Sequence, residues 1–96
     1  MYNSLRQAEE NETVRRLCSS YDGRALLWMI MEQTGLHNSV FSDSLAGMAR
    51  LAGQQEIAQW LRNWVLTVAP ECDIIMRREA EERTRRYNAE AQKEQD

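Results

Sequence analysis

The chain has 96 residues, of which 43% are hydrophobic and 28% are charged, and its formal net charge is −3. This length fits one small domain, and the balance of apolar and charged residues is typical of a folded globular chain rather than a disordered one. The slight excess of acid gives free nucleic acid no overall attraction, because phosphates draw proteins that are rich in Lys and Arg.

One proline and four glycines stand among long stretches of helix-forming residues. This leaves too few turns for a sandwich or barrel and predicts an all-α protein. We expect a compact three- to four-helix domain with a protruding charged C-terminal helix. The longest apolar run, residues 25–31, is too short for the about 20 residues of a membrane-spanning helix. The first residues also lack the pattern of a secretory signal, so we expect no membrane span and a cytosol-like location.

The first half of the chain contains signals for two helices. Ser4 begins an S-x-x-Q capping box, which predicts a first helix from that residue. Its apolar residues share one face from Val14 onward, so its first half is expected to lie exposed. Ser19, with an acid three residues later, predicts the cap of a second helix. That helix should end before Gly35, which can take the left-handed C′ conformation.

A third helix is expected after a loop over residues 36–42, whose apolar residues can fold back over the core. Ser42 or Asp43 should cap it. Gly53 lies on its apolar side and either lets another helix approach closely or breaks the helix in two; we favour a continuous or kinked helix. The stripe predicted to face the core comprises Leu45, Met48, Ala49, Ala52, Ile57, Trp60, Leu61, Trp64, Val65 and Val68.

The fourth helix should begin at Pro70, because the residue before a proline is pushed out of the α region. Its first turns are expected to dock on the core through Cys72, Ile74, Ile75 and Met76. From Arg77 onward the helix is rich in charges, so we divide the chain into a helical core domain, residues 1–76, and a charged helical tail, residues 77–96. Opposite charges at i and i+4 can stabilise this tail, namely Arg77 with Glu81, Arg78 with Glu82, Glu79 with Arg83, Glu81 with Arg85 and Glu82 with Arg86.

The sequence offers no arrangement that carries chemistry. Cys18 and Cys72 lie beside apolar neighbours and have neither metal-ligand nor C-x-x-C spacing, which predicts reduced and packed thiols. His37 has no partner at helical spacing for a metal or a nucleophile, and is expected on a loop surface. We therefore identify no catalytic residue, no metal ligand and no cofactor, and expect a protein that is not an enzyme.

Several short segments resemble a known family. They are the Gly23-Arg24 pair that opens the Leu-rich second helix, Phe41 after a short loop, Gly53 before an apolar helix, and Pro70 at that helix's end. Together they resemble a family of small helical proteins encoded among the head and tail genes of tailed bacteriophages, typified by a Bordetella podophage. The resemblance covers residues 14 to about 82. Ala52 and Gln55 depart from the Glu and Arg of the family's third signature, so no role of those two charges is transferred.

The resemblance implies a phage context with virion association, in the virion and the host cytoplasm, and no established chemistry. We expect a multicopy virion component or assembly factor near the portal, neck, tail or internal core, which acts by helix-mediated contact. The expected partners are other phage virion proteins and further copies of the chain. Nucleic acid is a less favoured partner. The alternatives are an ejection or packaging accessory that touches DNA, and a soluble host-takeover factor that binds a bacterial protein.

Two elements supply the candidate protein interface. Trp28 lies at the border of the buried face of the second helix; a core-edge role is favoured and contact with a partner is the alternative. The charged tail is either a solvated terminal helix or a segment that docks on a partner. Aromatic, Met and Arg side chains are enriched in interface cores. On this basis the candidate interface residues are Trp28, Met29, Phe41, Arg77, Arg78, Arg83, Arg85, Arg86 and Tyr87.

Overall fold

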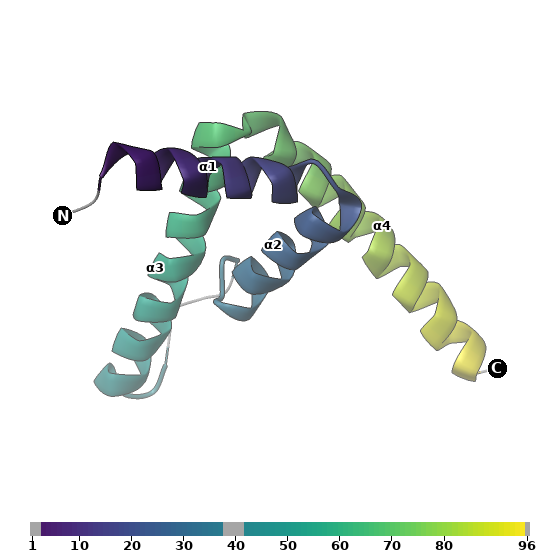
Figure 1. The fold of residues 1–96 in the computed structure, drawn as a ribbon. Helices are drawn as coiled ribbons and strands as arrows, with labels where there is room; N and C mark the ends of the chain where they lie inside the picture. Colours follow the sequence, from purple (N-terminus) through teal and green to yellow (C-terminus); the bar gives the residue numbers. More distant parts are fainter. Residues whose placement is uncertain (1–2, 38–41, 96) are drawn as a thin grey trace.

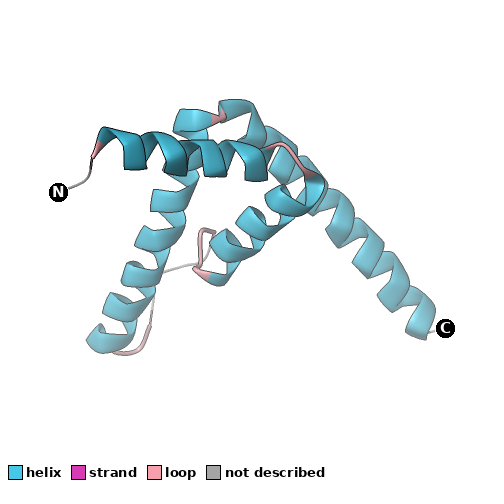
Figure 2. Ribbon diagram, in the orientation of Figure 1, coloured by secondary structure: helices cyan, strands magenta, loops and turns pink. Residues whose placement is uncertain are grey.

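The described part of the protein folds into four helices. The computed structural model describes residues 3–37 and 42–95, and contains α1 (Ser4–Cys18), α2 (Tyr21–Gln33), α3 (Leu45–Val68) and α4 (Pro70–Gln95) (Figure 1). No strand occurs in these residues (Figure 2). The all-α class is confirmed, and α4 protrudes as a long charged helix. The expected fold-back of Val40 and Phe41 lies outside the described residues.

The first three helices begin close to the expected positions but use other caps. The caps are the side chains of Asn3, Ser20 and Ser44, which accept backbone N–H groups at 2.7, 3.0 and 3.0 Å, respectively. The expected caps at Ser4, Ser19 and Ser42 or Asp43 are therefore wrong. A cap needs an extended backbone, which each observed cap has. Ser19 instead is helical and closes α1, its hydroxyl donating to the Arg16 carbonyl at 2.7 Å.

The predicted helix ends are confirmed at two places. Gly35 follows α2 with a φ of 82°, a left-handed conformation that glycine adopts without the steric cost of a side chain. Pro70 is the first residue of α4 and directly follows Ala69, the C-cap of α3. The turn between α3 and α4 is therefore a single residue long, which places the C-terminal end of α3 against the N-terminal end of α4.

The hydrophobic core lies where the second half of α1, all of α2, the end of α3 and the start of α4 meet (Figure 1). Each helix contributes a few side chains, and the buried residues are Val14, Cys18, Leu27, Met31, Leu61, Val65, Ala69, Cys72 and Met76. The exposed first half of α1 is confirmed. The expected docking of Ile74 and Ile75 on the core is wrong: both are exposed, because α4 turns its Cys72 and Met76 side inward.

The prediction that the whole apolar stripe of α3 faces the core is wrong. Leu61 and Val65 are buried, but Leu45 is 82% exposed, Ile57 51% and Trp60 60%. Apolar residues of α3 occupy more than one side of the helix, and the neighbouring helices cover only the side that carries Ala58, Leu61 and Val65. The first half of α3 extends past them (Figure 1).

Two glycines have opposite surroundings. A Cβ atom at Gly23 would lie 2.1 Å from the Leu17 carbonyl oxygen, so α1 and α2 can meet this closely only at a glycine. At Gly53 a Cβ atom would meet nothing within 4 Å. The helix continues through Gly53, as favoured from the sequence, and no described helix crosses close to it.

The molecule is flat and open. Its principal extents are 57 × 39 × 16 Å, so it is more than three times as long as it is thick. The radius of gyration is 16.4 Å, whereas a compact domain of this length has about 12 to 13 Å. Figure 1 shows the reason: α3 and α4 diverge from their shared turn, α2 lies between them, and α1 crosses the closed end.

An ion pair connects α2 to α4. The Arg24 guanidinium donates to both carboxylate oxygens of Glu79, at 2.7 and 2.9 Å, and to the Cys18 carbonyl at the end of α1, at 2.9 Å. Both charged side chains are only 16% exposed. The hydrogen bonds from Arg24 hold the pKa of Glu79 below its usual value, and the same bonds raise the pKa of Arg24. A bidentate pair of this kind sets orientation as well as distance.

A second ion pair spans the turn between α3 and α4. Arg62 donates to the two carboxylate oxygens of Asp73 at 3.1 and 3.3 Å. These hydrogen bonds to the Asp73 carboxylate raise the pKa of Arg62. Asp73 is buried, so its charge needs this partner.

None of the five ion pairs expected within the tail closes in the described part of α4. Glu79 bonds to Arg24 rather than to Arg83. The one ion pair inside α4 there is Lys93 with Glu90, at 3.6 Å. Exposed pairs on a helix contribute only about 0.3 to 0.5 kcal/mol each, so water competes well for these side chains.

The two cysteines are free and buried, as predicted. Cys18 ends α1 and Cys72 lies in the first turn of α4. Burial, together with a hydrogen bond to Cys18, raises the pKa of Cys72 to about 12. Its thiol therefore stays protonated at neutral pH, which makes it a poor nucleophile.

The Gly23→Ala variant should be destabilised, because its methyl group would press on the backbone of α1. We expect the free energy of unfolding to fall by about 1 to 3 kcal/mol, the usual cost of overpacking. The matched control is Gly53→Ala, which should gain up to about 1 kcal/mol from helix propensity. Urea melts followed by circular dichroism in dilute solution measure both, and equal stabilities would contradict the close contact at Gly23.

The Glu79→Gln variant should lose about 2 to 3 kcal/mol of stability at neutral pH, because it leaves a largely buried guanidinium without its counter-ion. Glu82→Gln, a change at an exposed position of the same helix, should alter stability by less than about 0.5 kcal/mol. Since folding lowers the pKa of Glu79, its contribution to stability is fully present above the pKa of the unfolded state and is lost as the pH falls through the lower pKa of the folded state. The gap between the wild type and Glu79→Gln should therefore narrow in acid; a gap that stays constant would contradict this role.

A candidate protein interface

The candidate residues of the charged tail surround α4 rather than form one patch. At about 100° per residue, Arg78 and Arg85 share one side, while Arg77, Arg83 and Arg86 point in other directions. All of them are exposed except Arg83, which is half-buried. These arginines therefore cannot contact one flat partner together.

Arg83 and Tyr21 hold α4 against the start of α2. The Arg83 guanidinium lies 5.4 Å from the centre of the Tyr21 ring and donates to the Tyr21 hydroxyl at 3.0 Å. Arg83 is thus part of the contact between helices rather than a free arginine for a partner. Beyond it α4 leaves the body of the protein (Figure 1). There Tyr87 is 59% exposed, with Arg86 stacked 5.4 Å from its ring centre.

Trp28 has the core-edge position favoured from the sequence. It is half-buried against the core, its ring centre is 5.8 Å from that of His37, and its indole N–H donates to Glu32. It also lines a cleft of about 320 Å³ between α2 and α4, together with Glu32, Ala80, Glu81, Thr84 and Arg85. Of the predicted interface residues, this cleft brings Trp28 and Arg85 together.

Two other predicted interface residues lie elsewhere. Met29 is 58% exposed, one residue and therefore about 100° away from Trp28, on the side of α2 that also exposes Leu26 and Ile30. Phe41 lies outside the described residues. The structure thus divides the predicted interface between the α2–α4 cleft, the outer side of α2 and the exposed residues 84–95, which we call the free end of α4.

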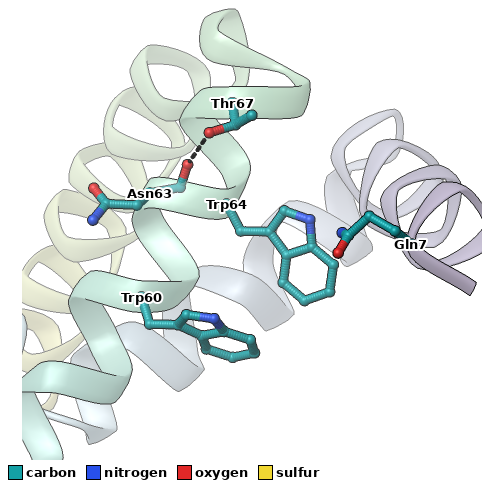
Figure 3. Close-up of a pocket in the computed structure, with 5 residues that line it drawn as sticks. All are labelled: Gln7, Trp60, Asn63, Trp64 and Thr67. Carbon is teal, nitrogen blue, oxygen red and sulfur yellow. Dashed lines mark hydrogen bonds between the residues drawn. The ribbon is translucent and has the colours of Figure 1, made fainter. Parts of the chain in front are cut away.

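A second cleft, none of whose residues is among the predicted interface residues, lies between α1 and α3. It has a volume of about 340 Å³ and is lined by Gln7, Trp60, Asn63, Trp64 and Thr67 (Figure 3). The Trp64 indole donates to the Asn11 side chain at 2.7 Å and so fixes α1 across α3. Trp60 stands beside it, with ring centres 5.3 Å apart and planes tilted by 51°. The sequence did contain a signal for this cleft. The apolar stripe on α3 has ten residues, which is too many for one core-facing side of the helix, so some of them had to lie elsewhere.

The described residues contain no group of three potential metal ligands, and none of the described helices is long and apolar enough to span a membrane. The two clefts contain partly buried aromatic rings with polar groups around them, which are features suited to contact with another molecule. Large contiguous apolar patches on a protein surface, unlike apolar side chains that are exposed singly, mark binding sites for other macromolecules.

The comparisons with known proteins identify one family. A family model described as "Bbp19-like phage protein" matches residues 14–85, which include all of α2 and α3, the core residues of α1 and α4, and the Arg24–Glu79 pair. Neither the curated proteins nor the solved structures gave a match. Because the family model covers most of the chain, the resemblance to a family of small phage proteins is confirmed. The protein belongs to the family of Bbp19-like phage proteins.

Proposed function

We propose that this phage protein is a structural or interaction component, present in several copies in the virion or acting in its assembly near the portal, neck, tail or internal core. It works by helix-mediated contact with other phage proteins and does not catalyse a reaction. The observation that carries this proposal is the open shape of the molecule. Its accessible surface is 7170 Å², whereas a compact monomer of 11.2 kDa exposes about 5,700 Å².

The character of the exposed surface supports the same function. Trp60, Met29 and Tyr87 are more than half exposed, and they lie on three different helices. Tryptophan, tyrosine and methionine are enriched where proteins bind proteins, and a partly exposed tryptophan is a frequent hot spot. Several such sites on one small frame suit a component that touches more than one neighbour.

Binding to DNA is the weaker candidate. The exposed arginines of α4 are interleaved with acids such as Glu81, Glu82 and Glu90, which would face the same phosphates. A binding protein for a host factor uses the same kind of surface as a virion component. The location of the protein in infection separates these functions.

Mass spectrometry of purified particles of the encoding phage should find the protein in several copies per particle, or in assembly intermediates that lack a finished tail. Both results rest on the exposed contact surfaces described above. Recovery from infected cells only in complex with a host protein would contradict the proposal. Duplex DNA binding that weakens steeply with salt would favour the DNA accessory instead.

The Asn88→Pro variant should break α4 beyond the body of the protein, because a proline inside a helix removes a hydrogen bond and clashes with the preceding turn. Residues 84–95 are exposed, so the core should keep its thermal stability. If the free end of α4 docks on a neighbour, the variant should be depleted from particles at least about tenfold, equivalent to about 1.4 kcal/mol of binding energy. The control Asn88→Ala should be incorporated normally. Normal incorporation of Asn88→Pro would show that this end is a solvated helix.

A further inference from the structure

The outer side of α3 is an apolar helix face that no other part of the described chain covers. It consists of Ala46, Ala49, Gly53, Ile57 and Trp60, and all five are exposed. Their spacings of three, four, four and three residues place them on one side of the helix, about 110° around its axis from the side that packs in the core. Along the about 21 Å from the first to the last, this side carries no charged residue. We call it the α3 face.

The composition of the α3 face matches that of an interface between identical subunits. Interfaces between identical subunits are the more apolar class, and charged residues are depleted at their centre. The two nearest charges, Arg50 and Glu56, lie about 60° to either side of the α3 face, where they would stay in water at the rim.

The order of small and large residues on the α3 face is complementary to itself in reverse. Gly53 is at the midpoint, with two alanines on its N-terminal side and Ile57 and Trp60 at the matching positions on its C-terminal side. In a two-fold contact each residue meets the one equally far beyond the axis. An antiparallel pair centred on Gly53 would therefore set Ala49 against Ile57, and Ala46 against Trp60, of a second copy. Small against large is what helix faces need to interdigitate.

The glycine completes this arrangement. A Cβ atom at position 53 would meet nothing within 4 Å in the single chain, so the fold itself does not require a glycine there. The glycine lowers the stability of the helix by up to about 1 kcal/mol relative to alanine. At the centre of a helix crossing, a glycine lets the two backbones approach closely. An antiparallel pair also separates the two α1 helices, which cross α3 near Trp64, to opposite ends of the contact.

We propose that a second copy of this chain covers the α3 face through an antiparallel, two-fold contact centred on Gly53. This rests on the proposed function, of which it specifies one partner and one surface. It leaves the free end of α4 and the α2–α4 cleft available for other phage proteins.

Sedimentation of the full chain over a wide concentration range tests the contact. The wild type should reach twice its mass of 11.2 kDa as the concentration rises. Gly53→Glu should raise the Kd about 100-fold or more, because it would bury two like charges at the axis. Its helical content should not change, since the position is open in the monomer. The matched control Gln54→Glu adds the same charge at an exposed residue beside the α3 face and should dimerise like the wild type.

A residue swap tests the antiparallel order. Ala49→Ile alone should weaken the dimer by setting two large residues against each other, and Ile57→Ala alone should leave a gap. The double variant Ala49→Ile with Ile57→Ala exchanges the two partners and should restore the dimer. In a parallel pair each position would meet its own copy, and no rescue would occur.

A chain that is monomeric at every concentration, a Gly53→Glu variant that dimerises normally, or a failed rescue by the double variant would each overturn this inference. These results are separate from the test of the proposed function. A monomer that is still found in particles would overturn only the α3 contact, and a dimer that is absent from particles and assembly intermediates would overturn only the virion role.

Discussion

The bidentate contact between Arg24 and Glu79 is the constraint on which the arrangement of the helices depends. One guanidinium bonds to a carboxylate of α4 and to the last carbonyl of α1, while its own backbone belongs to α2. Arg24 therefore joins α1, α2 and α4 in a protein whose hydrophobic core has few side chains. Because α4 is a single straight element, fixing it at Glu79 also sets the direction of the turns that lie beyond the body.

A small core and long helices together produce the open shape. Only the closed end of the molecule, where α1 crosses, is packed on several sides, and the two longest helices run past it as diverging arms (Figure 1). Such arms expose apolar side chains that a compact domain would bury. The two arms therefore carry separate surfaces for contact. One arm has the α3 face, and the other has the α2–α4 cleft and the free end of α4.

The two arms differ in chemistry. The α3 face is free of charge and has small residues at its N-terminal end and large ones at its C-terminal end, which favours packing against an antiparallel copy of itself. The free end of α4 carries both charge signs around its whole circumference and a single exposed tyrosine, which favours a wetter, orientation-dependent contact. The α3 face lies within the residues that the family model matches, and the last turns of α4 lie beyond them.

The sequence by itself determined the features that depend on local chemistry. The all-α class, the left-handed Gly35, the start of α4 at Pro70 and the two buried thiols follow from propensities and neighbours within a few residues. Adjacent residues compete to cap a helix, so the predicted caps of the first three helices were wrong by one or two positions. Tertiary structure alone decided which side of α3 is buried and that Glu79 bonds to Arg24, 55 residues away, instead of Arg83. An apolar stripe indicates only that one side of a helix is more stable when it is buried. Which other helix covers that side depends on contacts between residues far apart in the chain.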